Sequence, residues 1–196
     1  MKRICVFCGS SAGARPEYAR AAESLGRTLA ARGLGLVYGG SSVGLMHRMA
    51  TAALAAGGEV TGVIPEVLVD KEVAFTELSD LRVVGSMHER KALMAELADG
   101  FITMPGGFGT IDELVEMLTW AQLGIHDKPS GLLNVGGYFD SLMAFFDRSV
   151  EDRFLQPEHR KMLLVEEESA DLLDRLVSYE APKVDKAKWA LGLEKL

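Results

Sequence analysis

The stretch PGGFGTIDE, which ends at Glu113, places a carboxylate just after three glycines at the expected start of a helix. Thr110 and Glu113 stand three residues apart, the spacing of a capping box in which each side chain accepts a backbone N–H. The glycines Gly106, Gly107 and Gly109 leave N–H groups bare, and such groups at a helix start attract phosphate. Two roles are therefore open for Glu113: it caps a helix, or it does chemistry beside a bound anion.

A second candidate pair, Arg90 and Lys91, occurs in the stretch SMHERK near the start of another expected helix. Adjacent basic residues on helices are most often solvated surface charges. An arginine also offers a planar fork of donors that suits carboxylates and phosphates. If this helix start faces the same edge as Glu113, we expect Arg90 to pair with Glu113 or to clamp an anionic substrate.

The cysteines and histidines do not indicate a redox or metal centre. Cys5 and Cys8 form a C-x-x-C, but they fall inside an apolar, strand-like run, where residues three apart point to opposite faces. We therefore expect buried strand cysteines. The four histidines show no spacing of four residues that would place two of them on one helix face, so no metal site is predicted.

Strand-like and helical segments alternate along the chain, which predicts βαβ units and a parallel sheet. Most of the apolar runs are continuous rather than alternating, as in strands buried on both faces. The expected strands span residues 3–8, 34–39, 59–64, 81–84, 100–104, 130–135 and 162–166, and the expected helices span residues 16–32, 44–56, 88–98, 111–123, 138–150 and 170–179. The predicted fold is a single doubly wound, Rossmann-like α/β domain over residues 1–180, with helices on both faces of the sheet and a tail or terminal helix over residues 181–196.

In such folds ligands bind beyond the carboxyl ends of the strands. The loops after Cys8, Tyr38 and Met104 are all rich in glycine or serine, although each alone also fits a tight turn. No G-x-G-x-x-G opens a helix, and no Walker A lysine follows a glycine loop, so dinucleotide and P-loop ATPase functions are disfavoured. The pattern favours a mononucleotide-sized site built from backbone N–H groups.

Composition limits the partners. The chain has 196 residues, of which 25% are charged and 48% apolar, which is ordinary for a globular protein of one domain. A net charge of −7 argues against nucleic acid or a membrane as a partner, because both need clustered Lys and Arg. The first residues lead directly into a strand-like segment, and we expect a cytoplasmic protein.

Four motifs in this order, VFCGSS, YGGSSVGLM, SMHERK and PGGFGTIDE, resemble the LOG (Lonely Guy) family of cytokinin-activating phosphoribohydrolases. The resemblance extends from about Arg3 to Val165. It implies hydrolysis of the N-glycosidic bond of a nucleoside 5′-monophosphate, AMP or N6-prenylated AMP, to the free base and ribose 5-phosphate. It also implies that no metal or organic cofactor is needed, and that the protein is a homodimer whose sites take residues from both chains.

The resemblance further implies which residues form the site. Arg90 and Glu113 match catalytic residues, and Arg90 and Lys91 together match a substrate-binding pair. Thr119 matches a further substrate contact, and so does Glu72, although a solvated loop glutamate explains Glu72 equally well. The residues that match the phosphate loop and the catalytic acid are Gly107, Phe108, Gly109, Thr110, Ile111, Asp112 and Glu113.

The chain departs from the family pattern at Ser41 and His47, where many members have glycine. Either side chain changes how closely the loop approaches a phosphate or a base. These departures bear on substrate preference.

The expected chemistry gives Glu113 a role beyond capping. Breaking the bond between C1′ of the ribose and the base builds oxocarbenium-like positive charge on the sugar, which a carboxylate held near C1′ stabilises. The phosphate in the glycine loop fixes C1′ against that carboxylate. Arg90 orients Glu113 and favours its charged form.

Two other functions compete with hydrolysis. A nucleotide-binding or carrier protein would use the same fold and the same phosphate loop without turnover. Lysine decarboxylation, a label that this family has carried, needs pyridoxal phosphate on a Schiff-base lysine, and no local context singles out such a lysine.

Overall fold

The computed structural model of the chain describes residues 1–182 except residues 70, 72, 73 and 79. Its centre is one sheet of seven parallel strands in the order β4-β3-β2-β1-β5-β6-β7. The strands are β1 Arg3–Phe7, β2 Gly35–Tyr38, β3 Val60–Pro65, β4 Asp80–Val84, β5 Gly100–Thr103, β6 Ser130–Leu133 and β7 Leu163–Glu166. All seven predicted strands are therefore confirmed, with ends that differ by at most two residues.

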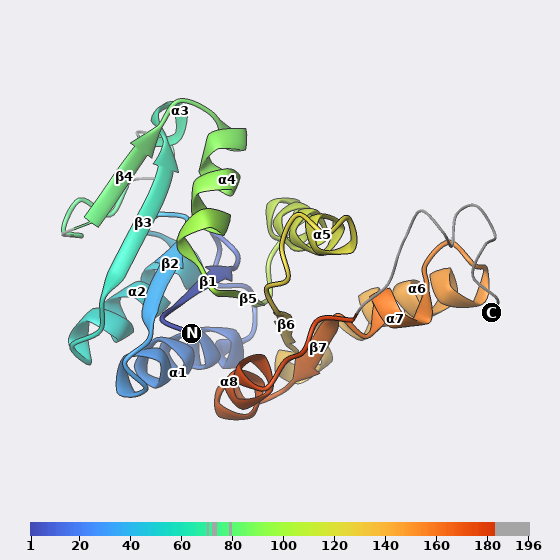
Figure 1. Cartoon of the computed structure of the whole chain (residues 1–196). Coiled ribbons are helices and arrows are strands. Elements are labelled where there is room, and N and C mark those ends of the chain that lie inside the picture. Colours follow the sequence, from blue (N-terminus) through green and yellow to red (C-terminus); the bar gives the residue numbers. More distant parts are fainter. Residues whose placement is uncertain (70, 72–73, 79, 183–196) are drawn as a thin grey trace.

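Helices cover both faces of this sheet, as predicted (Figure 1). The helices are α1 Pro16–Ala31, α2 Gly44–Ala55, α3 Glu66–Val69, α4 Met87–Leu97, α5 Phe108–Gln122, α6 Asp140–Glu151, α7 Pro157–Arg160 and α8 Ser169–Val177, with a 3-10 turn at Val135–Gly137. Helices α1, α2 and α8 pack on one face against Ile4 and Val6 of β1. Helices α4 and α5 pack on the other face against Cys5 and Phe7 of the same strand.

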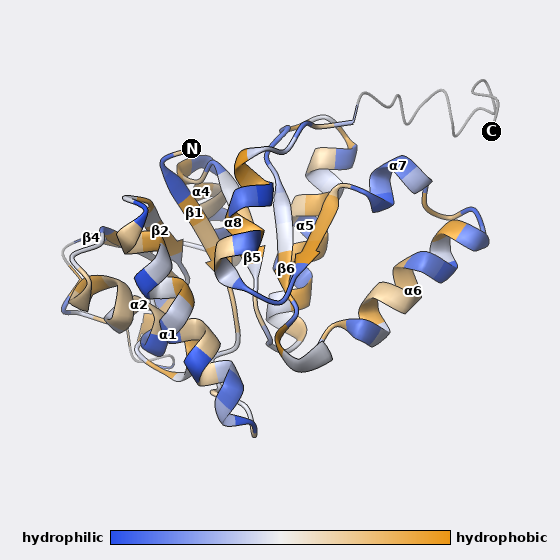
Figure 2. Ribbon diagram, turned by 90° about the horizontal axis from the view of Figure 1, so that it is seen from below, coloured by the Kyte–Doolittle hydropathy of each residue, from blue (hydrophilic) through white to orange (hydrophobic). Residues whose placement is uncertain are grey.

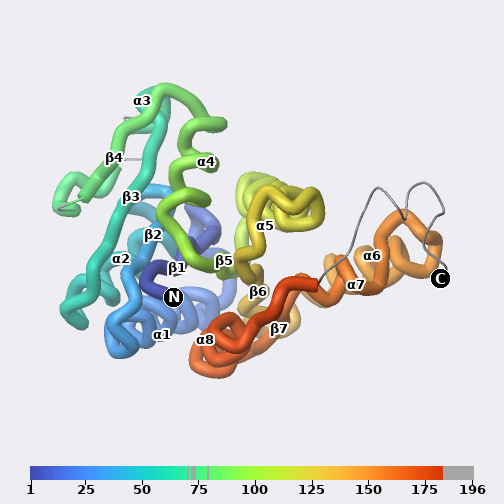
Figure 3. The backbone as a smooth tube through the Cα atoms, in the orientation of Figure 1, coloured from blue at the N-terminus to red at the C-terminus, as the bar shows by residue number. Residues whose placement is uncertain are grey.

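The direction of winding reverses at β1, which sets the place of the site. The chain runs outward from β1 through β2, β3 and β4, and then returns to the other side of β1 to form β5, β6 and β7 (Figure 3). The loops after β1 and β5 meet at this point, where the N–H of Gly9 donates a hydrogen bond of 3.0 Å to the carbonyl of Pro105. This is the switch point at which doubly wound folds bind ligands.

Helix α5 begins earlier than predicted. Its N-cap is Gly107, which has no side chain to cap it, and the N–H of Ile111 already bonds the carbonyl of Gly107 at 3.1 Å. Thr110 therefore lies inside the first turn and Glu113 in the second, so the capping box predicted for this pair is wrong. Because Gly is a poor helix former, Gly107 and Gly109 favour a loop in the sequence, although the fold places Gly109 in the first turn.

A side-chain cap does hold the start of α4. The hydroxyl of Ser86 accepts a bond of 3.1 Å from the N–H of Glu89, and the carboxylate of Glu89 accepts one of 2.8 Å from the N–H of Gly85. These bonds satisfy N–H groups that a helix start otherwise leaves free. They fix the turn from which Arg90 and Lys91 project.

The segment between β6 and β7 extends away from the sheet (Figures 1 and 2). It carries α6, of whose twelve described residues none is fully buried, and the four-residue helix α7. The four-residue helices α3 and α7 were not predicted. Of the expected tail, residues 181–196, the described part is residues 181 and 182. Within the described residues, no helix has the length and apolar character needed to cross a bilayer.

Candidate active site

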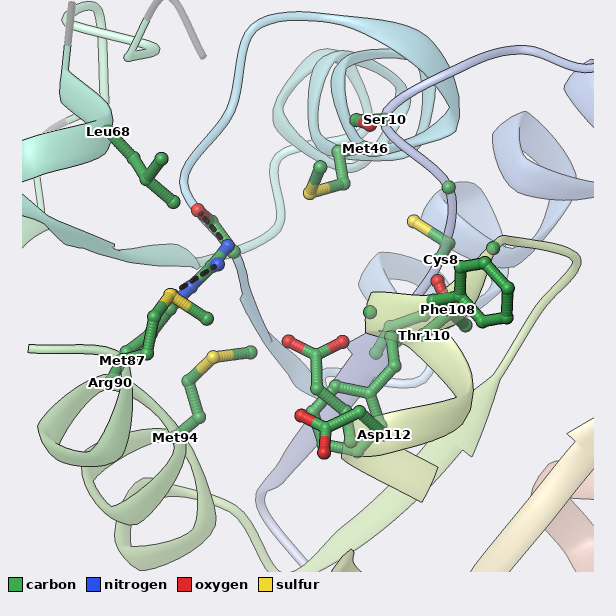
Figure 4. Close-up of a pocket in the computed structure, with 17 residues that line it drawn as sticks. Cys8, Ser10, Met46, Leu68, Met87, Arg90, Met94, Phe108, Thr110 and Asp112 are labelled. Carbon is green, nitrogen blue, oxygen red and sulfur yellow. Dashed lines mark hydrogen bonds between the residues drawn. The ribbon is translucent and has the colours of Figure 1, made fainter. Parts of the chain in front are cut away.

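A cavity of about 300 Å³ lies at the switch point, between α4 and α5 and beyond the carboxyl end of β1 (Figure 4). Helix α4 supplies Arg90 and two methionines to one wall, and α5 supplies the opposite wall. The described lining consists of Val6, Phe7, Cys8, Gly9, Ser10, Gly39, Met46, Leu68, Met87, Arg90, Met94, Gly107, Phe108, Gly109, Thr110, Asp112 and Glu113. The structure thus brings together the catalytic pair predicted from the sequence and most of the predicted phosphate loop.

Arg90 is held in place by main-chain carbonyls. Its side chain is buried, and its Nε donates a hydrogen bond of 3.0 Å to the carbonyl of Val63 on β3. Its Nη2 donates one of 2.8 Å to the carbonyl of Gly39, just after β2. A Cβ atom at Gly39 would overlap Nη2. The guanidinium therefore occupies the space that a side chain at residue 39 would fill. The two carbonyls, which belong to the sheet and to its adjoining loop, fix the position of the cation.

The start of α5 leaves its backbone open. Apart from the adjoining backbone, no heavy atom of the described residues lies within 4 Å of where a Cβ would be at Gly107 or Gly109. Phe108, the first residue of the helix, is 98% exposed although it lines the cavity. Thr110, by contrast, is buried, and its hydroxyl oxygen occupies the space that a Cβ at Gly106 would need. This end of the helix offers unobstructed N–H groups and the positive end of the helix dipole to an anion.

Glu113 brings negative charge to the cavity lining. Burial and the Glu113 carboxylate together raise the pKa of the Cys8 thiol, which keeps Cys8 protonated. Burial and then the same carboxylate raise the pKa of the Cys5 thiol. Both cysteines are free and buried, as predicted. The cavity therefore holds a carboxylate and a guanidinium against a neutral thiol.

Some predicted contacts lie elsewhere. Lys91 forms ion pairs with acidic residues of α5 and does not belong to the described cavity lining. Ile111 packs into the apolar cluster beneath α5. Thr119 lines a groove between α5 and α6, and its hydroxyl donates to the carbonyl of Val115 at 2.7 Å. Glu72 lies outside the described residues.

An apolar part of the wall was missed in the sequence. Met87 and Met94 of α4, Met46 of α2 and Leu68 of α3 all contribute to it (Figure 4). The Sδ of Met87 lies 3.8 Å from Nη1 of Arg90. The helical period alone cannot distinguish a core methionine from one that lines a cavity. The signal that was available is the pairing of Met87 with Arg90 three residues later on one helix face.

The two departures from the family pattern contact neighbouring residues of one segment, Ala74 and Phe75. Ser41 is fully buried and forms an isolated antiparallel bridge with Ala74. The His47 ring packs edge-on against Phe75, with centroids 5.1 Å apart. Neither side chain belongs to the described cavity lining. Among the described residues there is also no group of three His, Cys, Asp or Glu placed to hold a metal ion.

Known sequences decide the family. The family described as "Possible lysine decarboxylase" matches residues 46–176. The Arabidopsis thaliana protein LOG5, cytokinin riboside 5′-monophosphate phosphoribohydrolase, is 47% identical over 96% of this chain and 84% of its own length. The rice protein LOGL9, "Probable cytokinin riboside 5′-monophosphate phosphoribohydrolase", is 52% identical over 91% of this chain and 78% of its own length. The chain belongs to the LOG family.

Solved structures support the fold of this LOG family chain. The molybdenum cofactor carrier protein of Chlamydomonas reinhardtii has a TM-score of 0.69 and 24% identity, covering 91% of this chain and 99% of its own. The molybdenum cofactor binding protein of Rippkaea orientalis has a TM-score of 0.68 and 21% identity, covering 91% and 97%. At this identity the likeness establishes a shared Rossmann-like fold and nothing about ligands.

Proposed function

We propose that this LOG family protein hydrolyses the N-glycosidic bond of a cytokinin-type nucleoside 5′-monophosphate to the free base and ribose 5-phosphate. The observation that carries the proposal is that Glu113 and Arg90 line one cavity with the open, glycine-rich start of α5. A carboxylate, a fixed cation and an anion site are the groups that this reaction needs. The activity in the names of the Arabidopsis and rice relatives supports it.

In the proposed mechanism the 5′-phosphate binds the N–H groups at the start of α5, near Gly107 and Gly109. This contact fixes C1′ of the ribose close to the Glu113 carboxylate. As the bond from C1′ to the base breaks, its electron pair leaves with the base, and Glu113 stabilises the positive charge left on the sugar. Water then adds its oxygen to C1′, one of its protons is lost, and the base departs after gaining a proton.

The apolar wall supports a substrate with an apolar group on N6 of the adenine. Met46, Met87, Met94 and Leu68 offer flexible, polarisable surface that adapts to a branched hydrocarbon. Each buried methylene stabilises a complex by about 0.8 kcal/mol. We therefore propose N6-prenylated AMP as the preferred substrate over AMP.

A homodimer with shared sites is also part of the proposal. Val115 of α5, Phe145 of α6 and Phe154 after α6 are exposed and line one groove. Monomers rarely leave several large apolar side chains grouped on the surface without a partner. Thr119, which resembles a substrate contact, faces this groove rather than the cavity of its own chain. In the proposed dimer a second copy covers this groove, and Thr119 contributes to the partner's site.

The test is chromatography of the products after incubation with AMP and with isopentenyl-AMP. Wild-type protein is expected to release base from both, with the higher kcat/KM for isopentenyl-AMP. Glu113→Gln should lower kcat on the order of a hundredfold or more, because it removes the charge that stabilises the transition state. Arg90→Ala should also be strongly impaired. A phosphate-binding measurement on Glu113→Gln, expected to match wild type, controls for folding.

The same experiment separates the alternatives. Intact nucleotide after incubation, together with tight binding, would favour a carrier over an enzyme. Lysine decarboxylation receives no support from the cavity, because its described lining contains no lysine to form a Schiff base with pyridoxal phosphate. Free lysine incubated with pyridoxal phosphate and the protein should therefore yield no cadaverine.

A further inference from the structure

A cluster of three charged residues joins the two helices that flank the cavity. The Nζ of Lys91 on α4 lies 3.0 Å from Oδ2 of Asp112 and 2.9 Å from Oε2 of Glu116, both on α5. The Lys91 side chain is only 10% exposed, whereas that of Asp112 is 60% exposed. The Nζ of Lys91 donates a hydrogen bond to Oδ2 of Asp112, and its close approach to Glu116 is an ion pair.

On each of the two helices, a residue of the cluster is the sequence neighbour of a residue of the proposed catalytic pair. Lys91 follows Arg90 on α4, and Asp112 precedes Glu113 on α5. Arg90 projects from one wall of the cavity while Asp112 lies on the opposite wall (Figure 4). A change in the distance between the two helices here therefore moves Glu113 on α5 relative to the guanidinium of Arg90, which the sheet holds in place.

The charges of the cluster depend on one another. Burial alone would lower the pKa of the Lys91 ammonium, but the carboxylates of Glu116 and Asp112 outweigh it and raise that pKa above its ordinary value. Lysine is thus held charged in a largely buried position, which requires carboxylates close by. Conversely, Lys91 offsets two negative charges beside a cavity that is proposed to bind a phosphate.

Glu116 is the residue of the cluster at which a positioning role can be tested apart from a substrate contact. Asp112 lines the cavity, so it is able to touch a ligand directly. Glu116 does not belong to the described lining, and its contact in the cluster is Lys91. A substitution of Glu116 therefore weakens the link to Lys91 without removing a group from the described cavity lining.

We propose that Lys91 and Glu116 are positioning residues, whose ion pair ties α5 to α4 and so holds Glu113 in place opposite the sheet-anchored guanidinium of Arg90. This inference rests on the proposed hydrolysis of a nucleoside monophosphate. In this proposal Lys91 acts by holding α5 in place, and not by contacting the substrate. Displacing catalytic groups by about 1 Å can cost on the order of a hundredfold in rate, so a tie at this place controls turnover.

The test compares Glu116→Gln, Lys91→Met, Lys91→Arg and the double variant Lys91→Met/Glu116→Gln. Glu116→Gln should lower kcat about tenfold and leave KM within about twofold of wild type, because the geometry rather than binding is lost. Lys91→Arg should retain more of kcat than Lys91→Met, since it keeps the charge. The double variant should be no slower than Lys91→Met alone, since Glu116 acts only through Lys91.

A matched control is available on the far face of the sheet. Arg32, the residue that follows α1, pairs with Asp174 of α8 at 2.6 Å and so links these two helices. Asp174→Asn breaks this pair away from the cavity and should leave kcat and KM at wild-type values. A similar loss of kcat in this variant would show that any weakened helix contact slows the enzyme, and would overturn the proposal.

Hydrogen exchange provides a readout that does not depend on activity. Glu116→Gln should speed amide exchange in α4 and in the first turns of α5 and leave α1 unchanged. Unchanged exchange together with unchanged kcat would overturn the proposal, as would an equal further loss of kcat from Glu116→Gln in the Lys91→Met background. If wild-type protein releases no base, the proposed function fails, and exchange in α4 and α5 still decides whether the tie exists.

Discussion

Gly39 lacks a side chain at one of the two points where the guanidinium of Arg90 contacts the main chain. A Cβ at this position would overlap Nη2 of Arg90, so Gly39→Ala must displace the cation from the carbonyls that hold it. We expect kcat/KM to fall on the order of a hundredfold, because the catalytic geometry is lost while every charged group is kept. Steady-state kinetics with isopentenyl-AMP would measure this fall.

Gly35→Ala is a suitable control for this substitution. Gly35 lies at the opposite end of the same strand, β2, and a Cβ there would meet Cγ of Arg3, a flexible side chain that can move aside. Kinetics close to wild type are expected for this variant. If Gly39→Ala also kept wild-type kinetics, Arg90 would not need its main-chain anchors to act.

The strands and the long helices could be predicted from the sequence because their signals are local. Continuous apolar runs mark buried parallel strands, and a repeat of 3.6 residues marks amphipathic helices. Helices α3 and α7 have four residues each, too few to show a period. The start of α5 was misplaced because Gly107 and Gly109 oppose helix formation locally, whereas the fold around the switch point favours it.

The site was only partly predictable for a different reason. Glu113 and Arg90 were found because their motifs resemble those of a family. The carbonyls of Gly39 and Val63 that hold Arg90 come from other strands, and no local pattern announces such contacts. The partners of Lys91 likewise become visible only when α4 and α5 are placed side by side.

The connection between α5 and β6 should respond to pH through His126. Burial lowers the pKa of His126 below its usual value of 6.5, Lys128 adds to this effect, and Asp127 opposes it. As the pH falls below about 6.5, the unfolded chain takes up a proton at this residue while the folded protein resists it. The folded state therefore loses stability as the pH falls toward the lowered pKa.

We expect His126→Gln to weaken this dependence. Urea unfolding at pH 7.5 and pH 5.5 should show a larger loss of unfolding free energy in wild type than in the variant. Titration of the His126 ring by NMR gives the folded-state pKa directly. The other titrating groups are the same in both proteins, so any difference in the loss of unfolding free energy comes from His126. An equal loss in wild type and variant would contradict the prediction.

In a single chain, the apolar groove between α5, α6 and the segment that follows α6 is exposed to solvent. Phe145 is 63% exposed and Phe154 is 82% exposed, and both line this groove. The polar side of α6 carries an exposed ion pair between Arg148 and Asp152. This division of α6 into an apolar side and a charged side is typical of a helix with a partner.

Phe145→Glu is expected to convert the proposed dimer to a monomer, because an interface centred on aromatic side chains does not accept a buried unpaired charge. Light scattering would measure the change in mass. Arg148→Gln, on the charged side of α6, is the control and should leave the dimer intact. The monomer should also lose most of its turnover, since Thr119 faces the groove and would act on the partner's substrate. A Phe145→Glu protein that stays dimeric would place the interface elsewhere, and an active monomer would show that each chain completes its own site.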